Sequence, residues 1–287
     1  MEEIVYLNGK LMPRAEARVS VLDYGFLFGY GLYETLRAYE GKPFRLEAHL
    51  QRLEDSAKKI AIKLDMPELR QGVLDAVEAN GFADTRVRVT VSLGEGTMTP
   101  NVTSCLRPTT LVLAGEYHPF SAQKYAQGFD VTVSSIRKNS QSPVTFMKSA
   151  NSMENMLARQ EARNAGADEA LFLNETGYVT EASGSNVFFV EKGVVKTPRL
   201  ESGILPGVTR AAVLELAEGM GLKTSETDVR LGRISAASEV FLSNSLIEVM
   251  PVTALGGKPV ATGKPGPVTQ RMMDSYRNLV VSELRAQ

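Results

Sequence analysis

Short strand-like segments closed by tight turns recur along the chain, and they constrain the fold more than any other feature of the sequence. Residues 3–8 are followed by the hairpin turn NGK, and residues 33–39 by the turn EGK. Further strands are expected near residues 86–93, 109–114, 129–136 and 239–243, with several short strands between 170 and 198. Amphipathic helices are expected at residues 46–63, 67–80, 151–165, 209–220 and 266–285. Hairpins mixed with helices predict an α+β fold rather than a doubly wound parallel sheet.

The chain is expected to form two domains. Its 287 residues exceed the usual size of one domain, about 100–200 residues. A polar segment that contains Pro119 separates the two halves of the pattern. We therefore predict a small α+β domain at residues 1–117, a linker at 118–127 and a large α+β domain at 128–287.

Composition excludes several classes of protein. The formal net charge is -1 and no basic stripe is present, so no nucleic-acid partner is expected. The apolar stretches are shorter than the ~20 residues of a membrane helix, and the polar N-terminus does not resemble a signal peptide. Cys105 is the single cysteine, which is typical of a reducing compartment. The sequence thus predicts a cytoplasmic protein without a membrane partner.

Histidine and cysteine are too scarce for most metal or histidine chemistry. His49 and His118 are the two histidines, and no Cys/His cluster exists, so no metal site is expected. His49 lies in the charged helical segment EAHLQRLEDSAKK, where we expect a surface or groove-lining side chain. This scarcity indicates that a cofactor carries the chemistry.

Lys148 is the first candidate for a cofactor-binding residue. It follows an apolar, strand-like stretch and precedes the helix expected at 151–165, which Asn151 and Glu154 are expected to cap. The positive end of the helix dipole disfavours an ammonium group and favours the neutral amine, the form that attacks an aldehyde. On this segment alone, an exposed lysine without function is the preferred interpretation.

Two further segments suit a ligand that has a phosphate group and a flat aromatic ring. In GILPGVTR, Gly207 permits a tight turn and Thr209 stands at a helix start, whose N–H groups bind anions. Glu181 lies at a strand end before several small residues, where a carboxylate can pair with a pyridinium nitrogen. Ordinary capping and a solvated turn are the alternatives. The glycine-rich segment 25–31 lacks the spacing of a dinucleotide or P-loop motif.

Taken in order, these motifs resemble those of the class IV aminotransferases, the fold type IV group of pyridoxal-phosphate enzymes. This group includes branched-chain amino acid aminotransferases, D-amino acid aminotransferases and 4-amino-4-deoxychorismate lyases. The resemblance extends from residue 4 to about residue 275. The segments that carry it are FGYGLYETLRAYEG, HLQRLEDSA, MKSANSMENMLARQEA, ADEALFLNETGYVTEASGSNVFFV, GILPGVTR and EVFLSNSLIEVMPV.

The resemblance implies a role for each matching position. Lys148 is implied to hold pyridoxal 5'-phosphate as a Schiff base and to move the substrate proton, and Glu181 to pair with the pyridine nitrogen. The residues implied to bind the phosphate are Arg52, Val208, Thr209 and Ser245. The residues implied or expected to face the substrate are Tyr33, Arg37 and Leu246, with Phe26 and Phe28 extending the apolar wall. The resemblance also implies a homodimer, with the cofactor at the domain interface and a small-domain loop completing the neighbour's site.

The subfamily is less sharply defined by the sequence. Branched-chain enzymes usually carry glycine where Thr35 stands, a GTA-like turn at 244–246 and a tyrosine shortly after the lysine. The Lys148–Asn151 spacing resembles the D-amino acid and lyase groups, yet the segment 94–101 lacks the residues expected of either group. Transamination between a branched-chain amino acid and a 2-oxo acid such as 2-oxoglutarate is the preferred interpretation. The alternatives are a deoxychorismate lyase, a D-amino acid or (R)-amine transaminase, and a non-catalytic binding protein.

Overall fold

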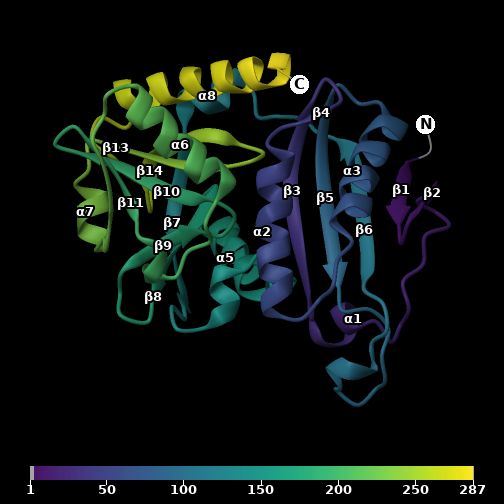
Figure 1. Cartoon of the computed structure of the whole chain (residues 1–287). Coiled ribbons are helices and arrows are strands. Elements are labelled where there is room, and N and C mark those ends of the chain that lie inside the picture. Colours follow the sequence, from purple (N-terminus) through teal and green to yellow (C-terminus); the bar gives the residue numbers. More distant parts are fainter. Residues whose placement is uncertain (1–2, 287) are drawn as a thin grey trace. The chain divides into compact units, whose positions relative to one another are not determined.

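The computed structural model describes residues 3–286, and the chain divides into two compact units (Figure 1). Unit 1 consists of Met1–His118 together with Met147–Asn151, and unit 2 consists of Pro119–Phe146 together with Ser152–Gln287. Each unit contains one sheet with helices, so the α+β class predicted from the sequence is confirmed. No helix of the described residues is long and apolar enough to cross a membrane.

Unit 1 is built on a six-stranded antiparallel sheet in the order β2-β1-β6-β5-β3-β4. Asn8 and Gly9, both with positive φ, make the tight β1–β2 turn. Helices α2 and α3 lie over the sheet (Figure 1). The elements are β1 (Ile4–Leu7), β2 (Lys10–Pro13), α1 (Tyr24–Phe28), β3 (Gly31–Tyr39), β4 (Lys42–Pro43), α2 (Leu46–Lys59), α3 (Met66–Asn80), β5 (Asp84–Ser92) and β6 (Thr109–Glu116), with a 3₁₀ turn at Val102–Ser104.

The hydrophobic core of unit 1 lies between the sheet and the two long helices. Leu50 and Leu53 of α2 and Val73 of α3 pack with Leu36 and Val89 of the sheet. This follows from the helical spacing of apolar residues on α2 and the alternation of apolar residues along β3 and β5. One face of β3 is therefore buried in the core, and side chains on the other face are available for a site.

Unit 2 is built on a nine-stranded mixed sheet in the order β12-β11-β10-β13-β14-β7-β8-β9, and β15 pairs with β14. Strand β7 runs parallel to both β14 and β8, whereas most other neighbours are antiparallel. The strands are β7 (Phe129–Lys138), β8 (Glu169–Asn174), β9 (Val179–Ala182), β10 (Asn186–Glu191), β11 (Val194–Pro198), β12 (Thr224–Thr227), β13 (Glu239–Asn244), β14 (Glu248–Leu255) and β15 (Lys258–Pro259). The helices are α4 (Ala122–Gln127), α5 (Met153–Asn164), α6 (Val208–Gly219), α7 (Leu231–Ser235) and α8 (Pro267–Ala286), with 3₁₀ turns at Pro143–Phe146 and Leu200–Ser202.

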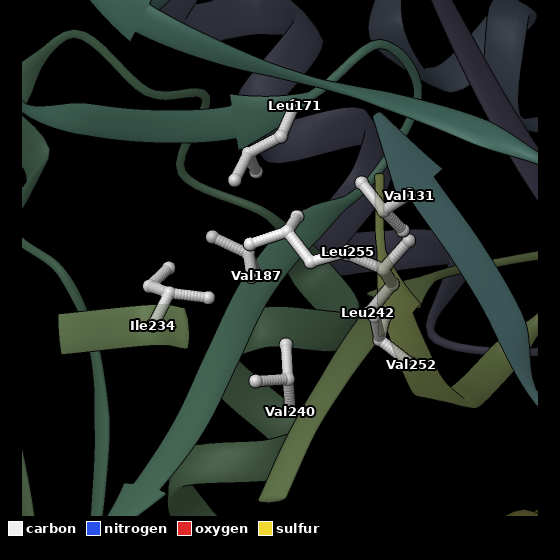
Figure 2. A pocket seen from close by; sticks show the side chains of 8 residues that line it. All are labelled: Val131, Leu171, Val187, Ile234, Val240, Leu242, Val252 and Leu255. Carbon is white, nitrogen blue, oxygen red and sulfur yellow. The ribbon is translucent and has the colours of Figure 1, made fainter. Parts of the chain in front are cut away.

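A small cavity in unit 2 is lined by aliphatic side chains (Figure 2). A ligand site normally has a few polar groups that fix the orientation of the ligand, and this cavity has none. It is therefore a packing defect of the core rather than a binding site. Its lining residues are Val131, Leu171, Val187, Ile234, Val240, Leu242, Val252 and Leu255.

The boundary between the units differs from the expected one in two places. Within the expected linker at 118–127, residues Ala122–Gln127 form α4, and its Tyr125 is buried and donates to the Ile247 carbonyl at 3.0 Å. The segment Met147–Asn151, expected in the large domain, belongs to unit 1 because its backbone pairs with β3. A buried phenol anchors α4, and backbone pairing anchors the lysine segment.

The helix expected at about residues 151–165 corresponds to α5, but the capping role expected of Asn151 is wrong. Helix α5 begins at Met153, its N-cap is Ser152, and no side chain makes the capping hydrogen bond. The Asn151 amide instead donates to the Gly29 carbonyl at 3.1 Å. Asn151 thus connects the lysine segment to the turn before β3 and does not cap the N-terminus of α5.

Candidate active site

Lys148 is held by strand-like pairing with β3. Tyr33 N–H donates to the Lys148 carbonyl, and Ala150 N–H to the Gly31 carbonyl, both at 2.8 Å. Helix α5 starts at Met153, five residues after Lys148 and two residues later than expected. Its Nζ lies 4.7 Å from the centre of the Tyr33 ring, and no carboxylate of residues 3–286 forms an ion pair with it. The amine is therefore oriented by backbone pairing and an aromatic face.

Arg88 lies on the same face of the sheet as Tyr33. The β3–β5 register places Thr90 opposite Tyr33 and Arg88 opposite Thr35. The Arg88 guanidinium carbon is 4.0 Å from the centre of the Tyr33 ring, and Nε donates to Thr90 Oγ1 at 3.2 Å. Burial lowers the pKa of Arg88 below its ordinary value. Within the described residues no carboxylate pairs with this half-buried cation, so it is suited to binding an anion.

Arg37 occupies the same face but has a different environment. Its Nε donates to Asp84 Oδ1 at 2.6 Å, and Nη2 bonds to Asp84 Oδ2. The guanidinium carbon also lies 4.4 Å and 4.8 Å from the ring centres of Tyr39 and Tyr117. Arg37 shares a face with Tyr33, as expected from their spacing, but its charge is already neutralised by Asp84. No local sequence pattern distinguishes Arg88, because its position opposite Thr35 becomes apparent only once β3 and β5 are paired.

The opposite face of β3 carries a buried charged network. Glu34 is fully buried and accepts two parallel hydrogen bonds from Arg52: Nε to Oε1 at 2.8 Å and Nη2 to Oε2 at 2.6 Å. His49 Nδ1 lies 2.7 Å from Glu34 Oε2. The expectation that His49 is a surface or groove-lining residue is wrong, because its side chain is only 2% exposed. Arg52, the expected phosphate ligand, is thus held in a fixed plane by Glu34.

The network fixes the charges of its members. Burial raises the pKa of the Glu34 carboxyl, but the charge of Arg52 and the hydrogen bonds from His49 and Arg52 lower it to about 2. Burial lowers the pKa of His49 by more than the hydrogen bond and charge of Glu34 raise it. At neutral pH the network therefore contains a carboxylate, a guanidinium and a neutral imidazole that donates from Nδ1.

In unit 2, Glu181 is connected to the segment that leads into α6. Its Oε2 accepts from Leu205 N–H at 3.0 Å and from Asn186 Nδ2 at 3.3 Å. Asn186 Nδ2 also donates to the Leu205 carbonyl at 3.0 Å. The Glu181 carboxylate is buried at the end of β9 and held in position by a backbone amide and a side-chain amide.

The N-terminus of α6 suits an anion. Gly207 is the N-cap, and within residues 3–286 α6 has no side-chain cap hydrogen bond, in contrast to α3, where the Asp65 side chain accepts from Glu68 N–H. A Cβ on Gly207 would lie 2.1 Å from Asn186 Oδ1, so this close approach requires glycine. Val208 and Thr209 open the helix. Amide groups at such a start bind a phosphate with favourable dipole and hydrogen-bond geometry, which fits the cofactor implied by the family resemblance.

Ser245 and Leu246 lie in the turn between β13 and β14. Asn244 Oδ1 accepts from the N–H groups of Leu246 and Ile247 at 2.8 Å and 2.9 Å, which fixes this turn. The neighbouring Ser243 pairs with Asn186, and its buried Oγ has no hydrogen-bond partner among the described residues. Polar groups of the turn are thus presented on unit 2, the unit that also carries Glu181 and the α6 N-terminus.

Comparison with known proteins identifies the family. The profile of the class IV amino-transferases matches residues 31–255. The chain is 33% identical to the D-alanine aminotransferase of Bacillus licheniformis over 97% of this chain and 98% of that protein. It superposes on the branched-chain amino acid aminotransferase of Escherichia coli with a TM-score of 0.93 at 29% identity, covering 98% of this chain and 95% of that one. The branched-chain enzyme from T.th., solved with pyridoxamine 5'-phosphate, gives a TM-score of 0.91 at 31% identity, covering 98% and 94%.

These matches and the geometry agree on the class of protein. An amine on a strand-paired segment, a buried carboxylate and an uncapped helix start are the groups that a pyridoxal-phosphate enzyme uses. The chain belongs to the class IV aminotransferase family and is a pyridoxal-phosphate-dependent aminotransferase.

The buried neutral His49 predicts a specific pH dependence of stability. In the unfolded chain His49 binds a proton near pH 6.5, whereas the folded protein resists protonation because its pKa is lowered. As pH falls below 6.5, the free energy of unfolding should therefore decrease, by up to about 1.4 kcal/mol per pH unit for one proton. In His49→Gln, the part of the pH dependence that comes from His49 should be absent. The measurement is the free energy of unfolding from urea titrations at several pH values.

The exposed His118 provides the matched control. His118→Gln should keep the wild-type pH dependence. If the free energy of unfolding decreases equally for wild type and His49→Gln as the pH falls below 6.5, the assignment of a buried, neutral His49 is contradicted.

Proposed function

We propose that this aminotransferase transfers amino groups between branched-chain amino acids and 2-oxoglutarate. The observation that carries the proposal is the arrangement of Lys148 and Arg88 about the Tyr33 ring, at 4.7 Å and 4.0 Å from its centre. It combines an amine, an apolar aromatic surface and a cation without a carboxylate partner in the described chain. The branched-chain enzymes among the structural relatives support the same substrate class.

Pyridoxal phosphate, when bound, supplies an electron sink that stabilises negative charge at the substrate Cα. We assign to Lys148 the covalent attachment of the cofactor and the transfer of the Cα proton at Nζ. We assign to Glu181 the retention of a proton on the pyridine nitrogen, since its carboxylate is buried and fixed by Leu205 and Asn186. The residues that we assign to the phosphate are Arg52, Val208, Thr209 and Ser245.

We assign to Arg88 the second carboxylate of 2-oxoglutarate. Its guanidinium is half-buried and stacked on Tyr33, so a carboxylate placed there gains a charge-assisted hydrogen bond in a poorly solvated position. Arg37 was the candidate for this role from the sequence. Its pairing with Asp84 favours instead a role in holding the ends of β3 and β5 together. Tyr33 and Leu246 are proposed to contact the aliphatic substrate.

A D-amino acid transaminase is the second candidate function. The D-alanine aminotransferase relative has 33% identity over nearly the whole chain, which is as high as the identity to the branched-chain enzymes. The choice between the two depends on substrate handedness, and a panel of L- and D-amino acids with 2-oxoglutarate tests it directly.

Lys148 should be indispensable for turnover. Lys148→Ala should lower kcat by several orders of magnitude, because the nucleophile and the proton-transferring group are lost together. Borohydride treatment of the wild type should attach the cofactor covalently to the peptide that contains Lys148, as read by mass spectrometry. The exposed Lys63 serves as control, and Lys63→Ala should retain both properties. Near-normal turnover in Lys148→Ala would refute the assignment.

Arg88 should discriminate between the two half-reactions. Arg88→Ala should raise KM for 2-oxoglutarate about ten- to a hundredfold, the equivalent of losing a hydrogen bond to a charged group. The KM for leucine should change much less. Arg86→Ala removes an exposed guanidinium two residues away on β5 and should change neither constant.

Three results would reject this substrate assignment. Equal losses for leucine and 2-oxoglutarate would exclude a specific role for Arg88. A preference for D-alanine or an (R)-amine would favour the second candidate. Release of pyruvate and 4-aminobenzoate from aminodeoxychorismate, without a 2-oxo acid acceptor, would indicate a lyase.

We further propose that the protein is a cytoplasmic homodimer that associates through two adjoining segments of unit 1, residues 21–26 and 98–106. Val21, Phe26, Met98 and Leu106 are 74%, 76%, 80% and 91% exposed. The hydroxyl of Tyr24 joins the two segments by donating to the Thr99 carbonyl at 2.9 Å. Large apolar side chains gathered in this way are typical of an interaction surface.

The oligomeric state of charged variants tests this surface. Phe26→Asp combined with Leu106→Asp should shift the protein from dimer to monomer in light scattering. Val281→Asp introduces the same charge at a half-exposed valine of α8 and should leave the dimer intact. A monomeric wild type would reject the proposal.

A further inference from the structure

We infer that Glu34 and His49 are positioning residues for Arg52, and that they fix its guanidinium in the orientation that binds the cofactor phosphate. The inference rests on the proposed phosphate role of Arg52. Glu34, His49 and Arg52 form one network on the core face of β3, with Glu34 at its centre. Nothing in the proposed chemistry requires Glu34 or His49 to touch the substrate or the cofactor.

The position of Glu34 is costly for the fold alone. It lies on β3 between Leu32 and Leu36, and all three side chains point into the same apolar core. A buried carboxylate loses its hydration, and a well-packed hydrophobic residue often stabilises such a position as much or more. A carboxylate at this position is therefore better explained by its hydrogen bonds to Arg52 than by a contribution to the stability of the sheet.

What Glu34 holds is the plane of a guanidinium. The two parallel hydrogen bonds involve the Nε and Nη2 groups of Arg52, and this bidentate geometry removes rotation about the last side-chain bonds. Because a guanidinium is rigid and planar, fixing one edge also fixes the direction of the other N–H groups. An arginine fixed in this way loses less conformational freedom when it binds a phosphate.

His49 holds the carboxylate in turn. It lies three residues before Arg52 on α2, so the two side chains emerge on the same helix face and reach the same carboxylate. Its Nδ1 lies 2.7 Å from Oε2, the oxygen that also accepts from Arg52 Nη2. The imidazole is buried and neutral, so it supplies a hydrogen bond to Glu34 without adding a second positive charge.

Phosphate recognition can be measured apart from the rest of cofactor binding. The full-length protein, freed of cofactor, is titrated with pyridoxal 5'-phosphate and with pyridoxal, which carries the same aldehyde and ring but no phosphate. The dissociation constant for pyridoxal divided by that for pyridoxal 5'-phosphate is the ratio that reports the phosphate contribution alone. The thermal midpoint of each cofactor-free variant is recorded beside it, since a purely structural role would affect that midpoint and both ligands together.

Glu34→Gln and His49→Leu should each reduce this ratio about tenfold, as is usual when the partner that orients a ligand-binding side chain is lost. His49→Asn should restore most of it, because the asparagine amide can donate from nearly the same place as Nδ1. Glu47→Gln, at an exposed position of α2, is the control and should leave the ratio unchanged.

A double-variant cycle decides whether Glu34 acts through Arg52. In an Arg52→Ala background, Glu34→Gln should have no further effect on the ratio. An effect that persists there, a ratio that is unchanged or higher in Glu34→Gln alone, or an equal loss for both ligands would overturn the inference while leaving Arg52 in its role. If Arg52→Ala itself leaves the ratio unchanged, the proposed phosphate role of Arg52 fails, and the inference fails with it.

Discussion

The candidate site in unit 1 depends on the backbone pairing between β3 and the segment Met147–Asn151. Two hydrogen bonds of 2.8 Å place Lys148 beside Tyr33, although the two residues are more than a hundred positions apart in the sequence. Once this pairing exists, the alternation of β3 distributes the other groups. Tyr33 faces Lys148 and Arg88 on one side, and Glu34 faces the helix that carries Arg52 on the other.

The two arginines on the Tyr33 face lie in different environments although they are close together in the sheet. Arg37 makes two hydrogen bonds with the Asp84 carboxylate, and its guanidinium lies against the rings of Tyr39 and Tyr117. Arg88 has the aromatic contact without a carboxylate partner in the described chain, and burial weakens its hold on the proton. A structural arginine brings its own counter-ion, whereas an arginine that binds a ligand acquires its counter-ion from outside.

Local patterns predicted the long elements well, because their periodicity is repeated over many residues. The expected helices at 46–63 and 67–80 correspond to α2 and α3, and the expected strand at 33–39 to β3. The failures concern partners that are distant in sequence. Asn151 has the composition of a helix cap but bonds to Gly29, and His49 lies in a charged helix but is buried against Glu34. Similarly, Arg88 could not be recognised as a site candidate before the β3–β5 register was known. Motif order suggested the cofactor residues, but it could not show which charges the protein itself neutralises.

The assignment of Met147–Asn151 to unit 1 has a consequence for synthesis and for evolution. The chain leaves unit 1 after His118, contributes to unit 2, returns for five residues and leaves again. During translation, unit 1 therefore cannot acquire its lysine until the first strand of the other unit has been made. For the same reason, recombination at the single boundary near residue 118 would separate Lys148 from the strand that orients it. An exchange of unit 1 between relatives would have to transfer two separate gene segments together. The two units are therefore expected to evolve together.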